Sequence, residues 1–351
     1  MHQNSLIDST IVAVGDIMLG RGLADVEKNS AIELLHSSVL DRLKGGLVTG
    51  NLECLLAATG IPNPFSHTHL YADFSFAKDL LSYFDVLTLA NNHIYDLGDE
   101  AIAATLSHLQ ALGIQAVGVG KTTDDALRPA IIKLGARNVA VFGITAVNNI
   151  TPSATKYIVA TPNEECFDRI KLYCSRNYYV IVHLHAGGGD TQYPSPHVIN
   201  MHKKLSDQGV SLVLGHHPHK IQGWHRNEKT LSFFSLGDFV FDKTENGRDQ
   251  ALIVTCNHVT GDFSTSIVQR NSNLEISLAS EEVSRNIHAE LSSLGEKIEA
   301  GEIARLYATA SKGIWLKRLK SLFRDFRAGG LTGVRRRIRS VILRKKNLSR
   351  I

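Results

Sequence analysis

Five histidines of this 351-residue chain gather in two short segments with the spacing of metal ligands. His183 and His185 are one residue apart at the end of the apolar run 178–185, and His217 and His219 are one residue apart in the segment GHHPH. In an extended chain, residues i and i+2 point to the same side, so each pair presents two imidazoles together. A single histidine of this kind is more often a hydrogen-bonded core residue, whereas two such clusters favour a metal site.

Acidic and amide side chains follow three other apolar runs. Asp16 comes directly after IVAVG, Glu53 lies in the segment GNLE, and Asn92 precedes His93 in LANNH. Carboxylate, amide and imidazole groups together suit a borderline divalent ion such as Mn²⁺, Fe²⁺ or Zn²⁺. Cysteine is absent from these motifs, which argues against a structural zinc site. Alone, Asp16 would be a turn residue and Glu53 a solvated charge, so only the whole set predicts a metal.

The elements that position these residues alternate between strands and helices in the first half of the chain, which implies parallel strands with right-handed crossovers. Later strands follow one another with little helix between them, which suggests a second sheet. Ligands bind beyond the carboxyl ends of the strands in open α/β sheets, so we expect the polar clusters to meet in one crevice of an α/β sandwich. The predicted strands are 11–15, 47–50, 86–90, 114–120, 130–134, 138–144, 178–185, 210–215, 231–237, 251–257 and 264–269, and the predicted helices are 76–83, 99–112 (capped by Asp99 and stopped by Gly113) and 197–208.

The composition is that of a globular protein, with 43% hydrophobic and 21% charged residues. It excludes a disordered chain, a fibrous repeat and a disulfide-rich miniprotein. No apolar stretch approaches 18 residues, so no transmembrane helix is expected, and the first residues do not resemble a signal peptide. Four scattered cysteines predict reduced, mostly buried thiols of a cytosolic protein: Cys54, Cys166, Cys174 and Cys256.

Charge divides the chain into an acidic body and a basic tail. Residues 311–351 contain fourteen Lys or Arg residues and one acid, Asp325, so this segment carries +13. Since the formal net charge of the whole chain is +4, residues 1–310 carry −9. The two parts therefore need separate explanations.

The motifs GDIMLGR, GNLEC, LANNHIYDLG, HLHAGGGD, GHHPH and SLGDF, in this order, resemble those of the CapA family of poly-γ-glutamate capsule biosynthesis. That family belongs to the calcineurin-like metallophosphoesterase superfamily, and the resemblance covers roughly residues 10–260. It implies a four-layer α/β/β/α sandwich with a metal-dependent hydrolase site, acting in the biosynthesis of a capsule, poly-γ-glutamate or a related surface polymer. We expect this domain to span 1–280, followed by a helical connector at 281–310 and the basic tail.

The resemblance also implies roles for particular residues. His93 would contact a substrate phosphate or protonate the leaving group, and Arg21, at the end of the first motif, would bind an anion. One or two divalent ions (Mn, Fe or Zn) would be held by the remaining motif residues, namely Asp16, Glu53, Asn92, His185, His217 and His219.

Three positions differ from the usual motifs of the CapA family and its superfamily. Met18 stands where the superfamily has the histidine of D-x-H, as is usual in CapA-like chains. The H-W-G motif followed by Glu is HAG here, with Asp190 as the nearest acid, and Asp238 replaces the Asn of SLGNF. Candidate substitutes for the missing histidine ligand are His67, His69 and His183.

Two other functions stay open at this point. One is a metal-dependent phosphatase or phosphodiesterase unrelated to a capsule, since phosphate esters are the usual substrates of the superfamily. The other is a non-catalytic biosynthesis or export subunit that keeps the fold. Loss of the histidine at Met18 favours the non-catalytic subunit, whereas Asn92, His93 and GHHPH favour an enzyme.

Apolar residues recur at helical spacing through 314–326, with Lys and Arg residues between them, and 334–346 repeats this chemistry. Such a segment fits a helix lying on an anionic membrane surface. A helix packed on the acidic body, or a disordered basic end, is the plainer alternative, and nucleic acid is a weaker one. We expect a cytoplasmic protein whose residues 314–346 contact the inner face of the membrane. Its substrate would be an anionic polymer or a phosphoester, and its neighbours would be capsule synthesis or export proteins.

Overall fold

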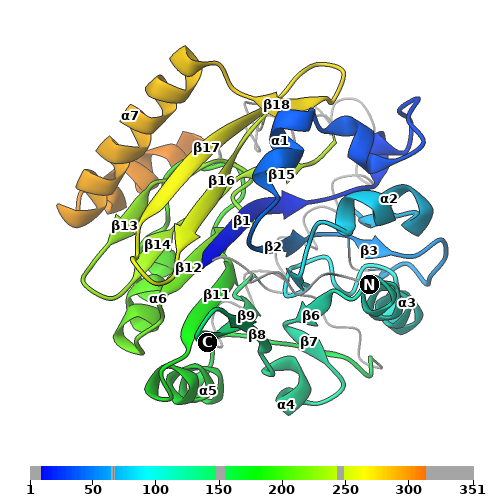
Figure 1. Ribbon diagram of the computed structural model, residues 1–351, viewed down its shortest axis with the longest axis horizontal. Coiled ribbons are helices and arrows are strands. Elements are labelled where there is room, and N and C mark those ends of the chain that lie inside the picture. Colours follow the sequence, from blue (N-terminus) through cyan, green and yellow to red (C-terminus); the bar gives the residue numbers. More distant parts are fainter. Residues whose placement is uncertain (1–8, 65, 67, 148–154, 243–248, 314–351) are drawn as a thin grey trace.

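Two β-sheets form the middle of the molecule in the computed structural model, which describes residues 9–64, 66, 68–147, 155–242 and 249–313 (Figure 1). The first sheet has eight strands in the order β18-β17-β16-β1-β2-β5-β6, with β15 also paired to β1. Strands β15, β1, β2, β5 and β6 run parallel, and β16, β17 and β18 are antiparallel. The bounds are β1 Thr10–Ile17, β2 Leu47–Leu52, β5 Val86–Thr88, β6 Gln115–Val117, β15 Asp238–Val240, β16 Gln250–Asn257, β17 Phe263–Arg270 and β18 Ile276–Leu278.

The second sheet has six strands in the order β13-β14-β12-β11-β9-β8. Its central strands β9, β11, β12 and β14 are parallel, and the edge strands β8 and β13 are antiparallel. The bounds are β8 Ala130–Leu134, β9 Arg137–Thr145, β11 Tyr179–His185, β12 Leu212–His216, β13 Trp224–Arg226 and β14 Leu231–Phe233. Two small pairs complete the strands: β3 Leu55–Leu56 with β4 Tyr71–Ala72, and β7 Val119–Gly120 with β10 Ile158–Val159.

Alternation of side chains along the strands defines four layers. Ile11 and Ala13 of β1 face Ile181 of β11 in the core between the sheets. Val12 lies on the other side of β1 in a core with helices, and Val182 does the same for the second sheet. The four-layer α/β/β/α sandwich is thereby confirmed.

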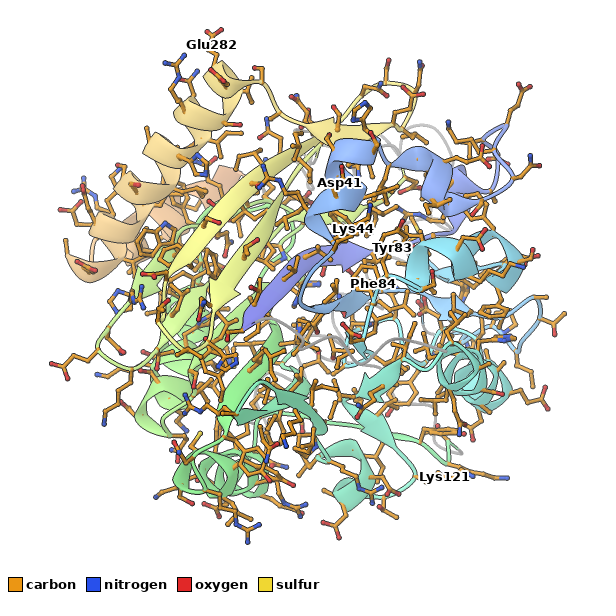
Figure 2. All side chains as sticks on the ribbon, in the orientation of Figure 1. Asp41, Lys44, Tyr83, Phe84, Lys121 and Glu282 are labelled. Carbon is orange, nitrogen blue, oxygen red and sulfur yellow. The ribbon has the colours of Figure 1, made fainter. Side chains whose placement is uncertain are left out.

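Helices cover the outer face of each sheet (Figure 1). Side-chain caps precede several of them. Asp73 accepts a hydrogen bond from the backbone N–H of Ser75, and Ser195 accepts one from the backbone N–H of Val198. Pro196 is the first residue of the helix that Ser195 caps. Charged side chains such as Lys121 and Glu282 project from the surface (Figure 2). The helices are α1 Ser37–Arg42, α2 Phe74–Leu81 and α3 Gly98–Ala111 on the first sheet, α4 Thr123–Ala126, α5 Glu164–Ser175 and α6 Pro196–Asp207 on the second, and α7 Glu281–Glu299; short 3-10 turns are η1 Arg21–Leu23 and η2 Ala31–Leu34.

Two details of the helices differ from the sequence prediction. Asp99 does not cap α3: the helix begins at Gly98 after Leu97, and the Asp99 carboxylate accepts hydrogen bonds from Thr155 and from the backbone of Lys156. Helices α1, α4 and α5 were not predicted. The stop of α3 at Gly113 is confirmed, because this glycine has a φ of +77°.

Helix α7 follows the last strand and packs against β13 and β17, where Leu291 and Leu294 join the core between the sheets. A further helical segment runs to Gly313. Residues from Ile314 onward lie outside the described residues, so the membrane helix expected at 314–346 stays a prediction. Within the described part of the chain, no helix is long and apolar enough to cross a membrane.

The four cysteines are free thiols, as predicted. Cys54, Cys166 and Cys256 are buried, and Cys174 is partly buried. Burial raises the pKa of each of the three buried thiols to about 12. These thiols are therefore packing groups and not nucleophiles.

Candidate metal centre

Strand register brings the polar clusters to one edge of both sheets. In the first sheet, Asp16 of β1 lies beside Asn51 of β2 and Asp238 of β15. In the second sheet, His185 of β11 lies beside His216 of β12. Because these strands are parallel within each sheet, their carboxyl ends form two adjacent rows of polar side chains.

Glu53, directly after β2, lies in the middle of these rows. It is fully buried, and neither carboxylate oxygen has a hydrogen-bond partner among the described residues. Its Oε1 lies 3.7 Å from His185 Nε2, 3.9 Å from His219 Nε2 and 3.9 Å from His93 Nε2. A buried carboxylate without donors is costly, but it is what a divalent ion would satisfy.

Two groups of three side chains share Glu53. One joins Glu53 to His185 and His217, and the other joins Glu53 to Asp16 and His219; in each group the three ligand atoms lie within 4.8 Å of one another. A cation placed at each group would share the Glu53 carboxylate. The donor set of imidazoles and carboxylates fits a borderline divalent metal.

Asn92 lies next to the first of these groups. Its side-chain oxygen is 2.7 Å from His185 Nε2, the same nitrogen that faces Glu53. The neighbouring Asn91 fixes the loop, because its amide donates to the Leu52 carbonyl (2.8 Å) and its oxygen accepts the backbone N–H of His93 (3.0 Å). Asn92 therefore places a neutral oxygen at the edge of the site.

Asp16 is held by partners that the sequence prediction missed. Asn51 donates its amide to Asp16 Oδ1 (2.8 Å), and His216 Nδ1 lies 2.8 Å from the same oxygen. His216 Nε2 is in turn 2.9 Å from His183 Nδ1, and His183 Nε2 is 2.8 Å from the Thr49 hydroxyl. This buried chain of hydrogen bonds fixes the orientation of Asp16, as the outer partners of metal ligands do.

His219 has its own orienting carboxylate. Its Nδ1 lies 2.8 Å from Asp238 Oδ1, which leaves Nε2 directed toward Glu53. His217 and His219 both have positive φ, of 92° and 59°. For non-glycine residues this conformation costs energy and is concentrated at functional sites.

The charges of the site are strongly coupled. Burial raises the pKa of Glu53 well above its ordinary range, and the nearby charge of Asp16 adds to this. Burial alone would also raise the pKa of Asp16, but the hydrogen bond and charge of His216 outweigh it and lower that pKa. Burial lowers the pKa of His219, yet the charges of Asp238 and Glu53 raise it to about 10. Without metal, this environment disfavours the negative charge of Glu53 and favours the positive charge of His219.

His93 lies at the partly exposed rim with a carboxylate behind it. Its Nδ1 is 2.7 Å from Asp96 Oδ2, and its Nε2 points toward Glu53. Asp96 is itself buried and accepts the backbone N–H of Leu70 (2.7 Å) and the hydroxyl of Ser66 (3.1 Å). The imidazole is thus oriented to exchange a proton at Nε2.

Arg21 is a neighbour of the site and not a part of its centre. Its guanidinium forms an ion pair with Asp242 and lies over the Phe241 ring, 5.4 Å from the ring centroid. That ring contacts the His219 imidazole edge-on at 5.1 Å between centroids. Arg21 therefore places positive charge two contacts away from the Asp16 group.

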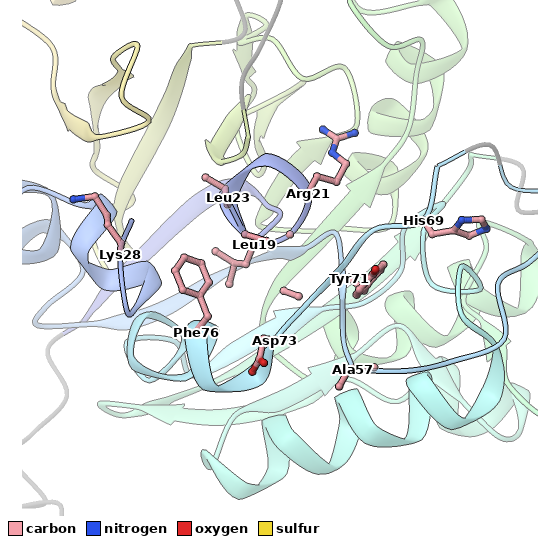
Figure 3. Close-up of a pocket in the computed structure, with 13 residues that line it drawn as sticks. Leu19, Arg21, Leu23, Lys28, Ala57, His69, Tyr71, Asp73 and Phe76 are labelled. Carbon is pink, nitrogen blue, oxygen red and sulfur yellow. The ribbon is translucent and has the colours of Figure 1, made fainter. Parts of the chain in front are cut away.

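A cavity of about 640 Å³ opens beside this segment. Lys28 lies at one end of it and His69 at the other, with Leu19 and Tyr71 between them (Figure 3). Because Leu19 and Arg21 follow Asp16 by a few residues, the cavity shares a loop with the candidate metal centre. Tyr71 is 46% exposed, so an aromatic face is available there.

None of the described candidates replaces the missing histidine ligand directly. Met18 is buried, and its sulfur accepts the backbone N–H of Gly20 (3.1 Å). His69 bonds to the Asn63 carbonyl (3.0 Å), and His183 reaches Asp16 only through His216. His67 lies outside the described residues, and Asp190 appears in neither ligand group.

The residues that sequence reasoning missed are Asn51, Asp96 and His216. Signals for two of them were present, since Asp96 is the acid of the D-x-G turn after LANNH and His216 is the first histidine of GHHPH. Their roles depend on side-chain contacts across strands, which spacing along the chain does not define. Asp238 was noted only as a departure from a motif.

A family model described as bacterial capsule synthesis protein PGA_cap matches residues 10–243, a range that contains every predicted site residue. The capsule biosynthesis protein CapA of Bacillus anthracis is 27% identical over 257 residues, covering 70% of this chain and 62% of that protein. The PGA biosynthesis protein CapA of Bacillus subtilis (strain 168) is 28% identical over 248 residues, covering 68% and 65%. The chain thus spans less than two thirds of the length of these relatives.

Two solved structures are distantly similar. TT1561 of Thermus thermophilus has a TM-score of 0.42 and 14% identity, covering 73% of this chain and 97% of that one. The 5'-nucleotidase from Candida albicans has a TM-score of 0.42 and 13% identity, covering 78% and 54%. The family match spans well over half of the sequence, and on that ground the chain belongs to the bacterial capsule synthesis protein PGA_cap family.

Proposed function

We propose that this chain is a metal-dependent hydrolase of the CapA type, acting in the biosynthesis of a capsule, of poly-γ-glutamate or of a related surface polymer. Family membership supports the biological role. The single observation that supports the chemistry is Glu53, a buried carboxylate without hydrogen-bond donors among the described residues, shared by two groups of potential ligands.

Each ligand group could hold one Mn, Fe or Zn ion, and the two groups share Glu53. Glu53, His185 and His217 would hold one ion, with the Asn92 oxygen beside them, and Asp16 and His219 would complete a second position with Glu53. A divalent ion in such a site polarises a phosphoryl or acyl oxygen and lowers the pKa of water.

His93 would supply the general acid. Asp96 accepts the hydrogen bond from Nδ1–H, so a proton is taken up or given at Nε2, which faces the centre. A positioned histidine of this kind contributes about 10² to 10⁴ in rate by protonating the leaving group.

Arg21 and the adjoining cavity would bind the substrate away from the reacting bond. An anionic group would compete with Asp242 for the Arg21 guanidinium, which prefers bidentate oxyanion partners. The cavity of about 640 Å³ is large enough for a further unit of an extended substrate. An anionic polymer or a phosphoester both fit this description.

Hydrolysis by protein loaded with Mn²⁺ or Zn²⁺ tests the proposal. The substrates are p-nitrophenyl phosphate, its bis ester and γ-linked glutamate oligomers, and the variants are His93→Ala and, as a matched control, the exposed His197→Ala. We expect turnover of at least one substrate, lost in His93→Ala and retained in the control. Turnover of phosphoesters without any effect on glutamate oligomers would favour a phosphoesterase unrelated to a capsule.

One observation favours the non-catalytic alternative. Met18 occupies the position of a histidine ligand, and its buried sulfur is already hydrogen-bonded to Gly20. Absence of turnover by the metal-loaded protein on every substrate tested would support a biosynthesis or export subunit that retains the metal site.

The location proposed for this enzyme is the cytoplasmic face of the membrane, reached through residues 314–346, which lie outside the described residues. The basic and apolar character of this segment supports the proposal. Sedimentation with anionic and neutral liposomes compares the full chain with one ending at Gly313. Binding of the full chain alone to anionic liposomes is expected, and equal binding by both chains would contradict it.

A further inference from the structure

A second cavity, lined mainly by polar groups and with a volume of about 390 Å³, lies at the opposite end of the sheets from the candidate metal centre. Tyr179, the first residue of β11, lines it, whereas His185 at the other end of the same strand belongs to a ligand group. Six residues of extended strand separate the two, or about 20 Å. The cavity is therefore independent of the metal centre.

Two hairpin turns, one from each sheet, form its rim. The turn between β13 and β14 is ordered by Asn227, whose side-chain oxygen accepts the backbone N–H groups of Lys229 (3.0 Å) and Thr230 (2.8 Å). The turn between β16 and β17 is ordered in the same way by Asn257. Arg226 connects the turns by donating to the Gly261 carbonyl (2.6 Å). These loops are pre-organised and not loose surface segments.

Three cations line this cavity, and among the described residues none of them is paired with an acid. Arg137 uses Nε and Nη2 to bond Asn177 and the Tyr178 carbonyl and lies over the Tyr179 ring, and no group in the described ranges bonds to its Nη1. Arg226 and Lys229 form no ion pair within the described part of the chain. Glu228 is the single acid among the described lining residues.

One of the lining residues is a buried imidazole without hydrogen-bond partners in the described part of the chain. His258 is only 3% exposed, and neither ring nitrogen has a hydrogen-bond partner among the described residues. The Tyr179 hydroxyl can donate a hydrogen bond, and burial raises the pKa of this phenol further above its ordinary value. Buried polar groups without partners need an explanation, and a bound ligand is a common one.

From these contacts we infer that this cavity binds a small multivalent oxyanion, a molecule carrying phosphate or clustered carboxylate groups. Arg137 and Arg226 offer planar donor pairs that match oxyanions, and Lys229 adds a mobile charge at the rim. The excess of positive charge is local, because residues 1–310 carry a formal net charge of −9. Three cations that line one cavity without an acid partner among the described residues attract an anion together.

Titration calorimetry on protein stripped of metal with a chelating resin and then dialysed free of chelator measures this site without metal at the other one. The probes are inorganic phosphate, pyrophosphate and tetraglutamate, with glucose as the uncharged comparison. The variant is Arg137→Gln, and the matched control is Lys133→Gln, a cation of the neighbouring strand β8 that does not line the cavity. We expect binding of at least one anion, weakened tenfold or more by Arg137→Gln and unchanged in the control.

The relative affinities identify the source of the anion. Tighter binding of phosphate or pyrophosphate assigns a phosphorylated molecule, and tighter binding of tetraglutamate assigns a carboxylate chain. Equal loss in Arg137→Gln and Lys133→Gln, or no binding of any probe by the wild-type protein, would overturn the inference.

A second variant separates binding from folding. His258→Leu removes an unsatisfied buried polar group, so the ligand-free protein should keep its Tm or gain a few degrees. We expect the same variant to weaken anion binding severalfold. A lower Tm together with unchanged anion affinity would make His258 a structural residue and would remove it from the site.

Discussion

Replacing Glu53 by glutamine keeps the shape of the side chain and removes the charge that both ligand groups share. In the metal-free protein this change should cost nothing, because the carboxylate is fully buried and has no donor among the described residues. A neutral amide avoids the penalty of burying an ion, so the free energy of unfolding should stay the same or rise.

The effect should appear when metal is added. A ligand that binds only the folded protein stabilises it by about 2.7 kcal/mol at one hundred times its dissociation constant. For a domain of this size, that corresponds to a rise in Tm of roughly 5 °C. Glu53→Gln should lose most of this rise, since both positions lose their common carboxylate.

Thermal unfolding with Mn²⁺ or Zn²⁺, compared with unfolding in EDTA, measures the difference directly. The matched control is Glu282→Gln, an exposed residue in the first turn of α7 that projects from the surface (Figure 2). The control should keep the whole metal-induced rise. A Glu53→Gln protein that is stabilised by metal as strongly as the wild type would refute the assignment of Glu53.

Four further predictions concern the groups around Glu53. His93→Ala should lower hydrolytic activity by about 10² to 10⁴ with metal content unchanged, and loss of metal in proportion to activity would make His93 a ligand. His216→Ala should weaken metal binding by about 10- to 100-fold, because Asp16 loses its partner at 2.8 Å; calorimetry showing unchanged affinity would argue against this role. The pKa of His219 is about 10 without metal, so binding must release a proton, and apparent affinity should rise by up to about tenfold per pH unit from pH 7 to 9. The pKa of His219 is about 10 in the folded protein and about 6.5 in the unfolded chain, so the metal-free protein should lose stability as pH rises from about 6.5 toward 10. A flat pH profile of Tm would contradict this prediction.

Much of the sandwich could be predicted from the sequence because its strands are unusually clear. Apolar runs such as 178–185 are buried on both faces and end in polar motifs, which marks both the strand and its carboxyl end. Helix α5 was missed although Asn163 caps it and Cys166, Phe167 and Ile170 have helical spacing. Its polar composition made this pattern weak next to the strands around it.

The centre of the site was less accessible to sequence reasoning. Asp16, Glu53 and His219 were found as separate motif residues, but that Glu53 is shared by two groups follows only from the packing of one sheet on the other. The same holds for His216, whose contact with Asp16 spans 200 residues of sequence. Contacts of this kind arise from the pairing and packing of strands and leave no periodic pattern.

The most direct test of the metal centre is anomalous diffraction from crystals grown with Mn²⁺ or Zn²⁺, recorded on both sides of the metal absorption edge. Two peaks on either side of Glu53 are expected, one near His185 and His217 and the other near Asp16 and His219. A single peak in one of these positions would leave one ion at the centre. A crystal with metal bound elsewhere and no peak within reach of the Glu53 carboxylate would contradict the account.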